Sequence, residues 1–165
     1  MKPKVLIIMG SDSDLPVMEE TARILDEFAV PYTMTVASAH RTPARTQKLV
    51  KDAEKNGVDV IIGAAGMAAH LPGVMASHTV LPVIGIPLDS SPLKGMDALL
   101  SIVQMPPGIP VATVSVGKAG AKNAAILAVQ IIALRDPKLT KQLQDYRRRM
   151  AQEVEEKADK IARKK

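Results

Sequence analysis

A histidine and an arginine stand next to each other at positions 40 and 41, within the segment 38–43, Ser-Ala-His-Arg-Thr-Pro. An imidazole gives and takes protons near neutral pH, so His40 is a candidate general acid–base. The guanidinium of Arg41 is a fixed cation that suits a paired hydrogen bond to phosphate or carboxylate. The pair follows a run typical of a strand and therefore indicates proton transfer on an anionic substrate. Taken alone, such a pair is more often part of a solvated surface turn.

A second polar turn, Gly-Ser-Asp-Ser-Asp at residues 10–14, also follows an apolar run. In an open parallel sheet, the first turn between strand and helix offers free backbone N–H groups to a phosphate. Ser11 and Ser13 could add hydroxyl donors, whereas Asp14 would repel phosphate and suits the hydroxyls of a sugar. The alternative is that Ser13 or Asp14 only caps the following helix.

A third turn spans Gly63 to Gly73, where small residues predict a loop that lets the backbone approach a flat ligand. His70 would reach toward that ligand, and neutral backbone groups would suit a carboxylate or carbon dioxide. Tight packing between strand and helix is the alternative reason for the glycines. The histidines at 40, 70 and 78 lack the paired spacings of common zinc sites, so we expect no metal, although ligation by histidines alone stays open.

Five short runs rich in β-branched residues would position these turns, and most are separated by stretches with helical spacing. Continuous apolar runs imply strands buried on both faces, and right-handed crossovers then give a parallel sheet. The predicted fold class is α/β, a three-layer doubly wound parallel sheet of five strands in a flavodoxin-like order. The predicted strands are Val5–Met9, Tyr32–Ala37, Val60–Gly63, Val83–Ile86 and Val111–Val116.

Helices are predicted over Leu15–Phe28, Ala44–Asn56 and residues 119–134, and a last helix follows Pro137. We expect the last helix to dock on a neighbouring subunit through one apolar stripe, although packing on its own domain is nearly as compatible with the sequence. Residues 74–117 hold three charged residues in 44, which also indicates contact with another subunit. The stripe consists of Leu139, Leu143, Tyr146, Met150, Val154 and Ile161.

Length and composition fit one domain over residues 1–165, with an α/β core at 1–137 and a basic amphipathic helix at 138–165. The net charge of +5 lies in that tail, which holds ten Lys and Arg against five Asp and Glu, while residues 1–137 hold twelve of each. One Phe, two Tyr and no Trp offer few rings to stack bases, so no nucleic-acid partner is expected. Without cysteine, a membrane-length apolar run or a recognisable secretion signal, the chain is predicted to be cytoplasmic and to have no membrane partner.

Four motifs keep a characteristic order and spacing: residues 9–14, residues 38–43, Ala-Ala-His-Leu-Pro-Gly at 68–73 and Ser-Ile-Val-Gln-Met-Pro at 101–106. Together they resemble the class I N5-carboxyaminoimidazole ribonucleotide mutases of purine biosynthesis. The resemblance extends from Val5 to about Tyr146 and includes residues 117–125. The charged tail carries no signature of that family.

The resemblance implies a rearrangement without cofactors, in which a carboxyl group leaves the exocyclic nitrogen of an aminoimidazole ribonucleotide and joins a ring carbon by way of carbon dioxide. His40 would carry the proton, and Ser11, Asp14 and Arg41 would bind the ribose phosphate portion. An octamer with its sites at subunit junctions is also implied. Further contacts to the substrate would come from Gly10, Ser13, Ser38, Ala39, Gly66, Ala68, His70 and Leu71.

The chain departs from the family pattern at a few positions. The third turn usually carries more glycine where this chain has Ala65 and Met67, and Asp89 stands where glutamine is frequent. The related class II enzymes, which carboxylate aminoimidazole ribonucleotide directly with carbon dioxide, typically have lysine at the position of Arg41. They also lack the run His-Leu-Pro-Gly found here at residues 70–73, so Arg41 and His70 favour the mutase. Direct carboxylation is the first alternative, and a non-enzymatic, flavodoxin-like phosphate- or nucleotide-binding module is the second.

Overall fold

The computed structural model describes residue 2 and residues 4–163. The chain forms two compact units, one ending at Val129 and the other beginning at Gln130. The helix α5 (Gly117–Ala133) begins in the first unit and ends in the second.

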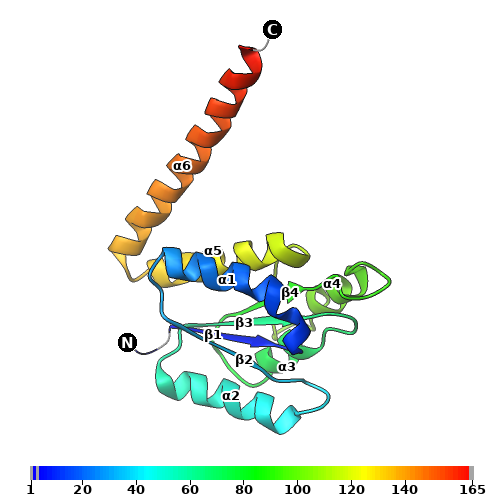
Figure 1. Ribbon diagram of the computed structural model, residues 1–165. Helices are drawn as coiled ribbons and strands as arrows, with labels where there is room; N and C mark the ends of the chain where they lie inside the picture. The colour runs from blue at the N-terminus through cyan, green and yellow to red at the C-terminus, as the bar shows by residue number, and fades with distance from the viewer. Residues whose placement is uncertain (1, 3, 164–165) are drawn as a thin grey trace. The chain divides into compact units, whose positions relative to one another are not determined.

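The first unit is built on a sheet of five parallel strands in the order β2-β1-β3-β4-β5 (Figure 1). Val5 at the start of β1 pairs with Tyr32 on one side and Val60 on the other, and Met9 at its end pairs with Val36 and Ala64. The predicted flavodoxin-like α/β fold is confirmed. The strands are β1 (Val5–Met9), β2 (Tyr32–Val36), β3 (Val60–Ala65), β4 (Val83–Pro87) and β5 (Ala112–Thr113).

Helices cover both faces of this sheet. Figure 1 shows α1 (Leu15–Glu27) and α5 over one face, and α2 (Pro43–Asn56) and α3 (Leu71–Ala76) over the other. The hydroxyl of Thr21 in α1 donates a buried 2.9 Å hydrogen bond to the carbonyl of Ala121 in α5, which ties those two helices together. The helix α4 (Met96–Val103) packs Ala98 and Ile102 into the same hydrophobic cluster as α2 and α3.

Every residue of β1, β3 and β4 is buried, as their continuous apolar sequences predict. Helix ends follow the expected local rules as well. Pro43 begins α2, and Gly57 ends it in the left-handed conformation with φ of 77°, at the predicted stop.

Several predicted boundaries were wrong. The strand β3 continues to Ala65, two residues beyond the predicted end, and α3 begins at Leu71, so the predicted loop from 63 to 73 shrinks to residues 66–70. Alanines extend the strand here because they fit between buried neighbours. The strand β5 covers two residues of the predicted Val111–Val116, since it lies at the sheet edge with β4 as its partner.

In the second unit, the helix α6 (Pro137–Ala162) begins at a capped end. The Asp136 carboxylate accepts hydrogen bonds from the backbone N–H groups of Lys138 and Leu139 at 3.0 and 3.3 Å. The predicted apolar stripe lies on this helix, and its members Met150, Val154 and Ile161 are exposed. Among the described residues, no helix combines the length and apolar character needed to span a bilayer.

Candidate active site

A cavity of about 560 Å³ lies beyond the carboxyl ends of β1, β2, β3 and β4. The chain leaves β1 toward one sheet edge and β3 toward the other, so this is the switch point where doubly wound sheets bind ligands. Its size suits a small ligand such as a nucleotide. The twelve predicted site residues all line it, and so do Ala65, Met67, Ala69 and Ser90.

Hydrogen bonds within the first turn hold Ser11 and Asp14 in place. The Ser11 backbone N–H donates to Asp14 Oδ2 at 3.0 Å, and the Ser13 backbone N–H donates to Ser11 Oγ at 3.4 Å. Together they form a capping box over the short 3₁₀ helix η1 (Asp12–Asp14), with Ser11 as its cap. Ser11 caps η1, because the chain makes a 3₁₀ turn before α1 begins. Asp14, one of the two caps considered from sequence, occupies the N-cap position of α1 but makes no side-chain capping bond to that helix.

Asp14 is a buried acidic side chain with 7% exposure. Burial raises the pKa of its carboxyl above the ordinary value, and the backbone N–H groups of Ser11 and Gly10 partly counteract that rise. A carboxylate at this position is costly to the fold, which makes a structural role alone a poor explanation for it.

The second turn is fixed by hydroxyl groups that satisfy its backbone. The Arg41 backbone N–H donates to Ser38 Oγ at 3.1 Å, and the Ser38 backbone N–H donates to Thr42 Oγ1 at 2.9 Å. His40 and Arg41 stand exposed at the tip of this turn. The Arg41 guanidinium reaches across to the first turn, where Nη2 donates to the carbonyl of Gly10 at 3.4 Å.

The third turn runs from Gly66 to His70 in a tight conformation. The Ala69 backbone N–H donates to the Gly66 carbonyl at 3.0 Å, and both Met67 and Ala69 have positive φ, 56° and 41°. A Cβ on Gly66 would lie 1.9 Å from Ser90 Oγ, so glycine lets this turn pack closely against the turn after β4 with the Ser90 side chain in its present position. The alternative reading of this glycine, tight packing, therefore holds at a position that also lines the cavity.

The second and third turns bring two imidazoles into contact. His40 Nε2 lies 2.6 Å from His70 Nδ1, and the rings meet edge to face with an interplanar angle of 76°. A hydrogen bond between these nitrogens needs an N–H on one ring and a lone pair on the other, because two facing N–H groups would repel each other. The pair can thus receive a proton at one ring and offer one at the other.

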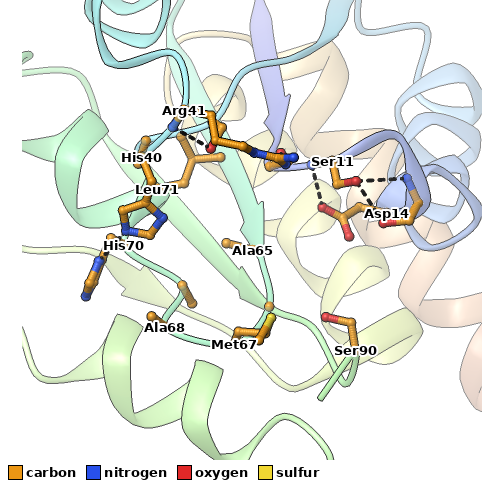
Figure 2. Close-up of a pocket in the computed structure, with 16 residues that line it drawn as sticks. Ser11, Asp14, His40, Arg41, Ala65, Met67, Ala68, His70, Leu71 and Ser90 are labelled. Atoms are coloured by element: carbon orange, nitrogen blue, oxygen red, sulfur yellow. Dashed lines mark hydrogen bonds between the residues drawn. The ribbon is translucent and has the colours of Figure 1, made fainter.

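Figure 2 shows how the polar groups are distributed in the cavity. His40 and His70 lie at one end, Ser11 and Asp14 lie at the other, and Arg41 extends between them. This arrangement can bind an anion and polar hydroxyls at one end while it moves a proton at the other. Within residue 2 and residues 4–163, no group of three or more His, Asp or Glu side chains is placed to hold a metal ion.

The fold and the cavity define a doubly wound α/β protein with a nucleotide-sized site at the carboxyl edge of its sheet. Residues 4–153 match the family described as AIR carboxylase, and the chain belongs to this family.

Relatives from several organisms share one name, N5-carboxyaminoimidazole ribonucleotide mutase. The relative from Pyrococcus horikoshii is 59% identical over 97% of this chain and 89% of its own length. The relative from Bacillus subtilis is 52% identical over 98% of this chain and 99% of its own. Among solved structures, the crystal structure of Treponema denticola PurE matches with a TM-score of 0.86 at 32% identity, covering 96% of this chain and 98% of that one.

Proposed function

We propose that this protein converts N5-carboxyaminoimidazole ribonucleotide to 4-carboxy-5-aminoimidazole ribonucleotide in purine biosynthesis. The name shared by relatives that are 50–59% identical supports this reaction. The structural observation that carries it is the single cavity in which the imidazole pair faces the Ser11, Asp14 and Arg41 group.

His40 is the proton carrier of the proposed mechanism. The bond between the exocyclic nitrogen and the carboxyl carbon breaks, its electrons stay on nitrogen, and nitrogen takes a proton from His40 as carbon dioxide forms. The ring carbon then attacks carbon dioxide, and the proton on that carbon returns to His40. The imidazole finishes in its starting state, so the reaction consumes no proton and needs no cofactor.

The first turn and Arg41 bind the ribose phosphate portion. The Arg41 guanidinium already lies beside the first turn, 3.4 Å from the Gly10 carbonyl, where it can pair with a phosphate placed over Ser11 and Ser13. Asp14 accepts hydrogen bonds from the ribose hydroxyls. These hydrogen bonds offset the free-energy cost of burying the Asp14 carboxylate.

The turn from Gly66 to His70 encloses the base and the carboxyl group, together with Leu71, Ser38 and Ala39. The small residues Gly66, Ala68 and Ala69 let the backbone approach a planar ring, and they leave an uncharged space suited to carbon dioxide. Confinement keeps carbon dioxide close to the ring carbon, and such proximity can supply much of the catalytic effect.

The active assembly that we propose is a cytoplasmic octamer with its sites at subunit junctions. Support comes from an exposed apolar surface on α4 and the segment before it, which includes Leu93, Met96, Leu100 and Val103. The exposed stripe of α6 offers a second surface for contact with neighbouring chains.

Turnover of a single substrate tests the proposal directly. Purified protein receives the carboxyamino nucleotide without nucleoside triphosphate or added bicarbonate, and the carbon-carboxylated product is followed. Product establishes the mutase. Product only from the uncarboxylated ribonucleotide at high bicarbonate would instead make the protein a direct carboxylase, and no product in either assay would leave a binding module.

A further inference from the structure

Met67 combines a disfavoured backbone with a long, exposed side chain at the cavity. Its φ of 56° lies in the left-handed region, which glycine adopts freely and methionine adopts at a cost. Its side chain lines the cavity and is 63% exposed. Strained residues of this kind cluster at functional sites, where the surrounding structure holds them.

Met67 is the only long side chain in a stretch of small residues. The surrounding positions 65, 66, 68 and 69 are all alanine or glycine, so this stretch otherwise has no side chain longer than a methyl group. Glycine at position 67 would remove the strain without loss of any buried packing, because the methionine side chain is mostly exposed. The chain thus keeps a side chain at position 67 despite a conformational cost.

The position of Met67 suggests what the side chain does. Figure 2 shows it between Ala68 and Ser90, at the wall of the cavity opposite Arg41. A thioether on three rotatable bonds is apolar and adaptable, so it can lie over an opening and exclude water without binding an ion. Apart from the hydroxyl of Ser90, the neighbouring lining residues at positions 65, 66, 68 and 69 present only backbone and methyl groups.

We propose that Met67 closes the wall of the cavity and retains carbon dioxide during the reaction. This inference rests on the proposed function. Free carbon dioxide is small, neutral and weakly held, so its return to the ring carbon competes with its escape to solvent. Met67 favours return by covering the route of escape.

Isotope exchange measures that competition. Full-length protein in excess over carboxyamino nucleotide reacts in ¹³C-bicarbonate with carbonic anhydrase present, and mass spectrometry gives the fraction of product that carries the label. Met67→Ala should raise that fraction by roughly five-fold, because escape becomes faster relative to recapture. Met67→Leu, which keeps an apolar side chain of similar volume, should stay within about two-fold of the unaltered protein.

Two further variants separate retention from other effects. Leu134→Ala removes an apolar side chain that is 85% exposed outside the cavity and should leave the labelled fraction unchanged. Met67→Gly should raise the melting temperature, because glycine relieves the backbone strain at this position. It should also raise the labelled fraction of the product, because it removes the side chain. This opposite movement of stability and retention would not follow from damage to the fold.

The competing outcomes overturn the proposal. Normal turnover of Met67→Ala with unchanged label would show that Met67 does not retain carbon dioxide. A smaller assembly of Met67→Ala in light scattering, compared with the unaltered protein, would make Met67 a subunit contact instead. If the unaltered protein forms no product, the proposed function itself fails and this inference fails with it.

Discussion

The contact between His40 and His70 links proton transfer at the two rings. With 2.6 Å between Nε2 and Nδ1, a change in protonation at one ring changes the hydrogen-bonding role available to the other. A proton carrier needs a defined tautomer in each half of its cycle, and a second imidazole can stabilise both. His70 therefore has a positioning role in addition to the contact with the base that we propose for it.

Replacement of His40 by asparagine should separate chemistry from binding. His40→Asn should lower kcat by about 10²- to 10⁴-fold, the usual contribution of a general acid–base. The dissociation constant for the nucleotide should change little, because Arg41 and the first turn bind the phosphate portion. Single-turnover kinetics and calorimetric titration measure the two effects.

The control for this substitution is His78→Asn, which changes a histidine outside the cavity and should leave both quantities unchanged. An equal loss of binding and turnover in His40→Asn would identify His40 as a binding residue and leave the proton carrier to be found elsewhere.

Asp14 should show opposite effects on stability and binding. Its raised pKa means that the folded protein binds this proton more tightly than the unfolded chain, so the charged carboxylate destabilises the fold above the folded pKa. That destabilisation is relieved as pH falls through the folded pKa toward the ordinary value. Asp14→Asn should therefore raise the melting temperature at pH 7, with a smaller gain at pH 4.

The same substitution should weaken substrate binding. Loss of a charged acceptor for ribose hydroxyls costs about 1–3 kcal/mol, which corresponds to a rise in KM of roughly five-fold to 150-fold. Thermal denaturation at the two pH values and steady-state kinetics measure these effects on one variant. A variant that is less stable at pH 7 and has normal KM would show that Asp14 serves the capping box alone.

The residue types in the sequence were enough to predict which residues form the site, but not how those residues contact one another. His40, Arg41 and the serines of the first turn could be selected from sequence, because polar groups after apolar strands gather at one sheet edge. The contact between His40 and His70 could not be predicted from sequence. The two residues follow β2 and β3, which lie on opposite sides of β1, and local sequence does not give side-chain direction. Ser90 lines the cavity because β4 is next to β3, which again depends on strand order.

At the scale of elements, predictions succeeded where one interaction dominates. Strand β1 has the predicted ends because an apolar run is followed directly by Gly10, and α2 ends at a glycine with positive φ. The helices α3 and α4 were not predicted. Pro72 lies in the first turn of α3, where proline is tolerated, whereas Gly73 disfavours a helix by local propensity. Burial of Leu71 and Met75 against the sheet overrides the preference of Gly73.

The packing of α5 depends on a single missing side chain. A Cβ on Gly120 would lie 1.6 Å from the carbonyl oxygen of Ser115, just after β5. That oxygen belongs to the backbone and cannot rotate away. Gly120→Ala should therefore displace α5 from the segment after β5 and lower the free energy of unfolding by about 1–3 kcal/mol. Urea denaturation measures the change.

The exposed neighbour Ala119 provides a control, since Ala119→Ser adds one atom without a buried contact. An unfolding midpoint of Gly120→Ala equal to that of the unaltered protein would show that α5 can shift at little cost. The alanine-rich sequence of the helix would then reflect helix propensity more than close packing.

At the scale of the whole molecule, the distribution of charge and apolar surface favours an assembly over a monomer. The tail carries the excess positive charge, yet it also carries exposed Met150, Val154 and Ile161 along one side of α6. A long helix whose apolar stripe stays exposed to water gains little stability, because most helical stability in proteins comes from packing of the apolar face. Contact with another chain would bury the stripe and leave the charged side in solvent.

Charge placed on that stripe should break the proposed octamer. Val154→Glu with Ile161→Glu puts two carboxylates where apolar contact is expected, so the mass in light scattering should fall to roughly half or less of the octamer. The matched control, Gln152→Glu with Arg163→Gln, changes the net charge equally on the opposite side of α6 and should leave the mass unchanged.

Because the proposed sites lie at subunit junctions, kcat/KM of the stripe variant should fall together with its mass. Normal mass with normal activity would make the stripe ordinary exposed surface and place the subunit contacts on α4, while lower mass with full activity would show that each chain completes its own site.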